Sequence, residues 1–484
     1  MSFLKYLPQR STERAILTAL MLLFILAVNV MRFQGLDSAP PGVHPDESID
    51  SATLQCIAEN GLKDPLAPHP VFTLMGYSFK GPTYIYPGIA WVKIFGFSVE
   101  SIRAYAASFI IMAIAGLFFL GRLLFGMQYA LWLCLLASIS PWIWPVSRFG
   151  NDSLVSLPFM AWGLFFFLRS NSWKDMAVAG LLLAGSVYGY STYRMFIPMV
   201  LPLLFLFKYS RHGLKLWPSA LCLGLFTVTL IPLVQLTLSG ALTQYFNEIS
   251  IFSKAFLNSI GKTDSFADIW DVYWRIYGLH LSPVYLFVHG QGSVMYLTQF
   301  CGLFSWIDIA GLAGAIVWAV RLGVKAGAYA KEKKFIPFAA LSLAAFFIGL
   351  IPVGFTHYNV PSVMRISEAW PFAMMFFAFF LWRHSLKARW LGIGLVILAC
   401  VFFTGYTRDY FANYPKANAM DFGARYKELA ERSKTDLDWV KFVVACGNDG
   451  MRARYYLMRY RGMTCNEADK FYMAISGHFK SRTW

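Results

Sequence analysis

Long apolar runs separated by short charged segments make up most of the chain. Runs such as 15–30 and 391–407 approach the ~20 residues that an α-helix needs to cross the hydrocarbon core of a bilayer. The alternating segments of about ten residues that a membrane β-barrel would need do not occur in this pattern. The sequence therefore predicts an all-α polytopic membrane protein with about eleven transmembrane helices.

Hydropathy places each of these spans along the chain. The predicted spans cover residues 15–33, 103–121, 127–145, 153–169, 176–190, 195–208, 217–238, 300–320, 335–352, 368–382 and 390–407. Between the first two, Gly81–Phe97 is apolar but rich in Gly and Pro, and its ~13 clean apolar residues are too few to cross. We therefore expect an interfacial or re-entrant helix there.

Basic residues fix the orientation of the spans. They precede the first span and fill alternate loops, which places the N-terminus in the cytoplasm. The short loops expected on the outer face hold one basic residue each, namely Arg148, Arg194 and Arg365. A net charge of +16 would suggest nucleic-acid binding in a soluble protein, but here the loop asymmetry explains it. We expect membrane lipids and no nucleic acid among the partners.

The predicted topology divides the chain into two units. Residues 1–407 form a transmembrane module with two long outer loops, at 34–102 and 239–298. Residues 408–484 form a soluble tail on the outer face, since long domains cross largely regardless of their charge.

The pattern of the tail predicts a small α/β cap. An amphipathic helix is expected near Phe422–Glu431 and an apolar strand near Trp439–Ala445. Cys446 and Cys465 share this polar region, and in an oxidising periplasm they are candidates for pairing. The spacing leaves open whether they form a disulfide.

Two adjacent carboxylates, Asp46 and Glu47, lie in the loop after the first span. Ionised groups close to hydrocarbon are costly and are usually kept for a function. One interpretation is a general base that takes a proton from an attacking hydroxyl. The other is a helix N-terminus, where acidic residues favour the helix dipole. Farther along the loop, Lys80 either meets a lipid phosphate as a point charge or extends to the lipid headgroups.

The short outer loops add further candidate side chains. Arg148 and Asp152 lie at the mouth of two spans, as substrate contacts or as an internal ion pair. Tyr193 and Arg194 join an aromatic face, a common sugar platform, to a cation, and Arg365 is a second phosphate candidate because a guanidinium suits phosphate oxygens. Each arginine is equally compatible with a headgroup contact.

Taken together, carboxylates and dispersed cations on one face suit transfer from an anionic, lipid-carried donor. A base would activate the acceptor while the cations stabilise the departing phosphate. The sequence has no phosphate-binding loop of the Gly-x-x-x-x-Gly-Lys type, no His-Glu-x-x-His zinc helix and no Gly-x-Ser-x-Gly elbow.

These motifs resemble the GT-C superfamily of glycosyltransferases, specifically the bacterial family-39 type related to protein O-mannosyltransferases and aminoarabinose transferases. The resemblance runs from the first span to about Phe380. The matching pieces are His44-Pro45-Asp46-Glu47, Lys80-Gly81-Pro82-Thr83-Tyr84-Ile85-Tyr86, Ser140-Pro141 through Arg148 and Asp152, Tyr193-Arg194, and Pro361 through Arg365.

The resemblance implies a polyprenyl-phosphate-sugar donor, inversion at the anomeric carbon and Asp46 as the base. Glu47 and Asp152 would position the acceptor or hold an optional divalent metal. The residues expected to bind the donor phosphate are Lys80, Arg194 and Arg365. Those expected around the sugar or acceptor are Asp152, Arg148, Tyr84, Tyr193 and His357. Two positions depart from the family pattern: Gly81 stands where the family often has Pro, and Phe79 where a relative has an acidic residue.

Two other classes of function remain open at this point, a polytopic transporter and a membrane scaffold whose outer tail binds a partner, although a scaffold would leave the acids of the first loop without a role. A polytopic transporter would place polar groups near the midplane on broken helices in repeated halves, whereas here the charges lie in the outer loops. A ligase or polymerase of lipid-linked polysaccharide is a close variant of the transferase. The expected location is a bacterial inner membrane with the site on the periplasmic face, and the acceptor, whether glycan, lipid or protein, stays open.

Overall fold

The computed structural model of the protein describes residues 7–60, 72–75, 78–240, 242–290, 294–324, 328–387, 389–447 and 449–476. Within them it is almost entirely helical, and the one sheet is a two-stranded hairpin. Every predicted span coincides with a helix. These helices are α1 (Leu7–Met31), α4 (Val99–Phe125), α5 (Met127–Ile139), α6 (Ser156–Arg169), α7 (Trp173–Gly189), α8 (Tyr193–His212), α9 (Leu216–Thr229) continued by α10 (Ile231–Leu238), α14 (Trp306–Val324), α16 (Ile336–Gly349), α17 (Trp370–Lys387) and α18 (Arg389–Ala412).

The length and composition of the helices confirm a helical membrane protein. Six segments of the described residues are long and apolar enough to cross a membrane, and three shorter apolar helices accompany them. Only 22% of the apolar 18-residue stretch within Leu216–Leu238 is buried inside the protein, so this segment is suited to face lipid. The total of eleven crossings stays a prediction.

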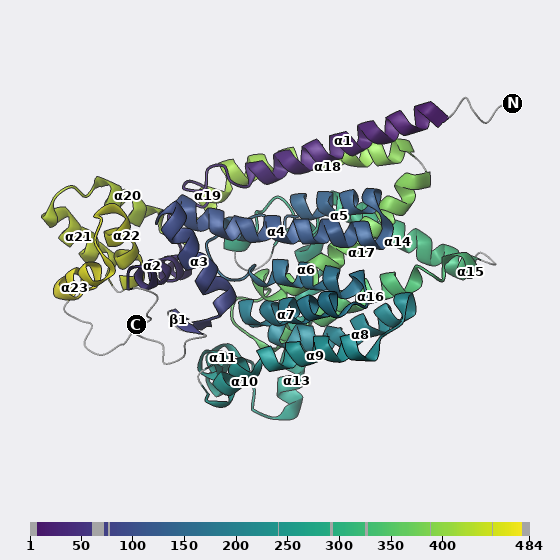
Figure 1. Ribbon diagram of the computed structural model, residues 1–484. Helices are drawn as coiled ribbons and strands as arrows, with labels where there is room; N and C mark the ends of the chain where they lie inside the picture. Colours follow the sequence, from purple (N-terminus) through teal and green to yellow (C-terminus); the bar gives the residue numbers. More distant parts are fainter. Residues whose placement is uncertain are drawn as a thin grey trace.

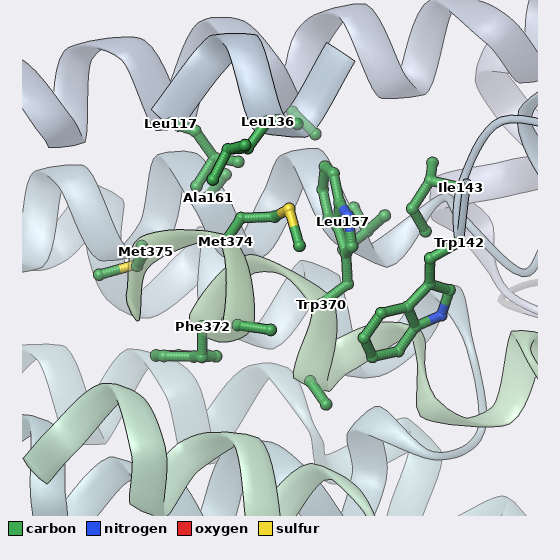
Figure 2. Packing of buried hydrophobic residues seen from close by; sticks show 14 of the residues in the cluster. Leu117, Leu136, Trp142, Ile143, Leu157, Ala161, Trp370, Phe372, Met374 and Met375 are labelled. Atoms are coloured by element: carbon green, nitrogen blue, oxygen red, sulfur yellow. The ribbon is translucent and has the colours of Figure 1, made fainter. Parts of the chain in front are cut away.

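Helices α5, α6 and α17 form the centre of the bundle. Figure 2 shows Trp142, Leu157, Trp370 and Met374 in one packed cluster. Buried indole N–H groups need acceptors, and both find one: Trp370 Nε1 donates to Ser140 Oγ at 3.0 Å, and Trp142 Nε1 to the carbonyl of Val363 at 3.1 Å. These bonds fix the loops after α5 and before α17 against each other.

The loops predicted to be cytoplasmic meet at one end of the bundle. Arg211 Nη2 donates to the carbonyl of Leu124 at 2.8 Å, and Arg383 forms a 2.7 Å ion pair with Glu332. The start of α1 and the short helix α15 (Ala328–Glu332) lie at this end, whereas α2 (Pro45–Glu59) and the C-terminal helices lie at the opposite one (Figure 1). The two sets of loops therefore segregate as the charge pattern requires.

The loop after α1, which is predicted to lie on the outer face, carries α2, a hairpin and a short helix. In the hairpin, β1 (Thr73–Met75) pairs antiparallel with β2 (Ser78–Lys80), so that Thr73 lies opposite Lys80. Helix α3 (Pro82–Phe95) follows directly and has 14 residues, which confirms the short helix expected at Gly81–Phe97. Gly81 caps it where a Cβ would lie 2.0 Å from the carbonyl oxygen of Tyr188, which explains why this chain has no Pro there.

The remaining outer-end elements are short helices. They are η1 (Val146–Arg148), α11 (Thr243–Ile249), α12 (Lys254–Ser259), α13 (Phe266–His280), η2 (Val284–Val288), η3 (Val294–Tyr296), η4 (Pro352–Phe355), η5 (Met364–Ala369), α19 (Tyr414–Ala417), α20 (Ala424–Arg432), α21 (Asp436–Cys446), α22 (Gly450–Tyr460) and α23 (Cys465–Ser476). Four of them, α20 to α23, make up the tail, which is the lobe beside α2 in Figure 1.

One prediction for the tail is wrong, and the structure answers the question of pairing that the sequence left open. The strand expected near Trp439–Ala445 is helix α21, because Thr435 and Asp438 form a capping box that starts a helix there. Cys465 pairs with Cys56 of α2, while Cys446 is free and buried. The sequence offered Cys446 as a candidate because it shares the polar region, whereas the partner of Cys465 lies 409 residues away.

Candidate active site

The two adjacent acids of the first loop lie in opposite environments. His44 caps α2: its Nδ1 accepts from the backbone N–H of Asp46 at 3.2 Å, and burial lowers the pKa of this imidazole, so it is neutral when it accepts. Asp46 lies in the first turn with 58% of its side chain exposed, whereas Glu47 is 2% exposed. Only Asp46 is therefore placed to meet a substrate.

Glu47 is held in a buried ion pair. Arg103 of α4 donates to both carboxylate oxygens, at 2.7 and 2.8 Å, and the backbone N–H of Gly150 adds a bond at 3.0 Å. The remaining guanidinium bonds of Arg103 go to the carbonyls of Leu36, Pro40 and Gly42. This geometry does not support the catalytic role predicted for Glu47, since its lone pairs are used to fix the loop.

Lys80 lies between two carboxylates. Its Nζ donates to Asp152 Oδ1 at 2.8 Å and lies 3.4 Å from Asp50 Oδ2. Burial raises the pKa of Asp50 to about 8, against the opposing charge of Lys80. Asp46, one turn before Asp50 on α2, also acts on Lys80 electrostatically. Sequence reasoning missed Asp50, although its spacing of four residues from Asp46 places both on one face of a helix.

The other two predicted phosphate ligands belong to the same end of the bundle. Arg194 opens α8 within electrostatic range of Asp152, and its buried Nε has no hydrogen-bond partner. Arg365 Nη1 donates to Thr356 Oγ1 at 3.1 Å and to the carbonyl of Tyr358. Tyr190 lies within electrostatic range of Arg365, Asp152 and Lys80, which belong to three different loops. The structure thus brings Lys80, Asp50 and Asp152 into contact, and Arg194 and Arg365 belong to loops at the same end of the bundle.

Arg148 lies apart from this group and serves the fold. Its side chain is fully buried, and its donors bind backbone carbonyls of Arg32, Gln34 and Ala39. Neither predicted role is supported: the side chain reaches no open surface, and Asp152 pairs with Lys80 instead.

The predicted aromatic and histidine contacts differ from the expected sugar platform. Tyr84 and Tyr193 are buried, with 1% and 0% of their surface exposed, because their rings pack into the bundle. His357 stacks on Phe256 with ring centroids 3.8 Å apart, and its Nε2 lies 3.1 Å from the carbonyl of Glu248. Tyr358, 52% exposed beside Arg365, is an aromatic ring open to a ligand here.

The optional metal does not fit the residues as they stand. Glu47 is engaged by Arg103 and Asp152 by Lys80, so both predicted ligands already neutralise a cation. Across the described residues, no group of three His, Cys, Asp or Glu side chains could hold a metal ion.

Comparison with known proteins bears on this region. Residues 81–234 match the family model described as dolichyl-phosphate-mannose-protein mannosyltransferase. The predicted resemblance is confirmed over this segment. It contains α3 to α9 and the start of α10, together with Asp152 and Arg194, whereas the acids of α2 lie before it. No curated protein matches the chain in sequence.

Two solved structures are similar over most of the chain. ArnT from Cupriavidus metallidurans, bound to undecaprenyl phosphate, has 13% identity and a TM-score of 0.48, with 94% of this chain and 75% of that chain covered. The oligosaccharyltransferase AglB from Archaeoglobus fulgidus, with an inhibitory peptide and a dolichol-phosphate, has 16% identity and a TM-score of 0.49. In that match 98% of this chain covers 61% of AglB.

Proposed function

We propose that the protein is a membrane glycosyltransferase that moves a sugar from a polyprenyl-phosphate donor to an acceptor on the periplasmic face of a bacterial inner membrane. The observation that carries this proposal is the placement of Asp46. It is an exposed carboxylate one turn before Asp50 on α2, within electrostatic range of Lys80, and it lies at the end of the bundle that holds Arg194 and Arg365. A base on one side and cations on the other suit displacement of a phosphate.

In the proposed mechanism, Asp46 takes the proton of the acceptor hydroxyl as that oxygen attacks the anomeric carbon. The bond to the donor phosphate breaks on the opposite side, which inverts the configuration. The negative charge that develops on the leaving phosphate is stabilised by Lys80, Arg194 and Arg365. Burial raises the pKa of Asp50 and so favours its neutral acid, which leaves Asp152 as the ionised carboxylate in contact with Lys80, and the donor phosphate competes with Asp152 for this ammonium group.

The proposal is tested on the purified protein in lipid nanodiscs. Undecaprenyl-phosphate-linked sugars are supplied, and release of undecaprenyl phosphate is measured together with sugar transfer to envelope glycan, lipid and peptide acceptors. Loss of one sugar from envelope glycans of a deletion strain, seen by mass spectrometry, identifies the acceptor. Movement of donor across the bilayer without release of the carrier would favour a transporter, and activity only with diphosphate-linked glycans would favour a ligase or polymerase.

We expect Lys80→Gln to raise the KM for donor by about 10- to 100-fold, since a hydrogen bond to a charged group is worth about 1.5–3 kcal/mol. Lys262→Gln is the matched control: Lys262 also lies between two carboxylates, Asp268 and Asp271, at 3.0 and 3.2 Å, but on the second outer loop. Donor titrations in the transfer assay give the KM for donor of each variant. An unchanged KM for donor in Lys80→Gln would remove Lys80 from the phosphate site.

The orientation predicts opposite labelling of two exposed residues. Met420, before α20, is 90% exposed, and Tyr329, in α15, is 63% exposed. In a background with the free cysteines replaced, Met420→Cys should react with a membrane-impermeant maleimide on intact spheroplasts. Tyr329→Cys should react only after permeabilisation. The reverse pattern would invert the topology and place Asp46 in the cytoplasm.

A further inference from the structure

Helix α2 and the tail share one hydrophobic core. Ala52 and Cys56 of α2 lie in the same cluster of buried side chains as Phe442 of α21 and Tyr456 of α22. In Figure 1, α2 lies against the lobe formed by α20 to α23, away from the middle of the bundle. The helix that carries Asp46 is therefore packed by the end of the chain as well as by its beginning.

The C-terminal end of α2 is tied to α23. Cys56 forms a disulfide with Cys465, the first residue of α23. Glu59, the last residue of α2, accepts from the backbone N–H of Cys465 at 3.0 Å. A covalent bond and a charge-assisted hydrogen bond thus fix the same pair of helix ends.

The N-terminal end of α2 is held by the tail as well. Arg452 of α22 is buried, and its Nε donates to the carbonyl of Val43 at 2.8 Å. The ring of Phe422 lies 5.9 Å from that of His44, the residue that caps α2. Gly42 approaches the tail so closely that a Cβ there would lie 2.4 Å from the carbonyl oxygen of Phe422. The turn that begins with Asp46 is consequently placed by contacts from the tail.

We propose that the tail helices α20 to α23 are a positioning device for α2, and that the Cys56–Cys465 disulfide locks α2 in the orientation that presents Asp46. This inference rests on the proposed function, in which Asp46 is the base. Because transfer requires the acceptor oxygen and its base in near-attack geometry, a displacement of α2 by about 1 Å costs up to ~100-fold in rate. Donor binding through Lys80, Arg194 and Arg365 is expected to persist without the disulfide, because these residues lie on β2, α8 and η5 and Lys80 keeps its ion pair with Asp152 when α2 and its Asp50 move.

The first test is kinetic. The double variant Cys56→Ser/Cys465→Ser should lower kcat by about 10- to 100-fold and leave the KM for donor unchanged. Cys446→Ala is the matched control, since Cys446 lies in the same tail core but forms no disulfide, and it should keep its kcat. Equal kcat values in the double variant and the wild type would overturn the proposal, and so would a rise in donor KM with kcat retained.

The second test avoids a variant that fails to fold. A small dithiol reduces the Cys56–Cys465 bond of the wild type to two thiols and is itself oxidised to a cyclic disulfide. We expect kcat to fall and to return when oxidised glutathione restores the bond. A kcat that is the same before and after verified reduction contradicts the inference.

A third measurement separates failure of this inference from failure of the proposed function. Hydrogen exchange of the α2 amides, followed by mass spectrometry, should accelerate by about tenfold or more on reduction, while exchange in α4 stays constant. If the wild type shows no transferase activity but exchange in α2 accelerates on reduction, the disulfide does hold α2 and the proposed function is wrong. If transferase activity is present and exchange in α2 does not change on reduction, the proposed function is supported and the inference that the disulfide holds α2 is wrong.

Discussion

Asp46→Asn is expected to lower kcat for sugar transfer by about 10²- to 10⁴-fold, the range that loss of a general base produces. Asparagine has the same size and keeps the polar contact at the start of α2, but it cannot take a proton. The side chain is 58% exposed, so the protein should fold and insert normally. The variant therefore isolates the chemical step.

This prediction is checked by single-turnover transfer in nanodiscs, with the donor in excess of its KM. Asp264→Asn serves as the control, because Asp264 is an exposed carboxylate, 63% accessible and paired with Lys254 on the second outer loop. It should retain the wild-type rate. Transfer by Asp46→Asn within about threefold of the wild type would refute Asp46 as the base. The normal thermal unfolding profile expected of the variant excludes misfolding as the cause of a loss.

Much of the fold follows from local signals in the sequence. Each predicted span coincides with a helix because a long apolar run in lipid must satisfy its backbone internally. The short α3 was also predictable, since Gly81 and Pro82 mark its start and its apolar run ends at Phe95. The meeting of Lys80 and Asp152 is consistent with their assignment to outer loops of the same bundle.

The roles of individual side chains depended on contacts that the sequence does not encode locally. Asp46 and Glu47 are neighbours of the same type, and only the position of Arg103, 56 residues away, decides which one is buried. Arg103 lies at the start of a predicted span, where an arginine was unexplained by hydropathy. The disulfide of Cys465 and the backbone contacts of Arg148 likewise join segments far apart in the chain. Pattern and spacing carry no information about such pairings.

Arg103→Leu is expected to destabilise the protein by about 3–5 kcal/mol, the cost of leaving one member of a buried ion pair without its partner. Glu47 would keep a buried charge with only the backbone N–H groups of Gly150 and His44 to balance it. Three backbone carbonyls would lose their donor at the same time. The loop before α2 should then loosen, and transfer should fall with the folded fraction.

Denaturant titration in a mild detergent, followed by tryptophan fluorescence, measures this loss. Arg275→Leu is the matched control, because Arg275 forms a 2.9 Å pair with Asp271 but is 73% exposed, and such surface pairs contribute about 0–1 kcal/mol. The double variant Arg103→Leu/Glu47→Leu should recover part of the loss, since it removes the unpaired charge, but not all of it, since the carbonyls stay without a donor. A loss below about 1 kcal/mol in Arg103→Leu would show that this pair does not hold the first loop, and the exposure of Asp46 would then need another cause.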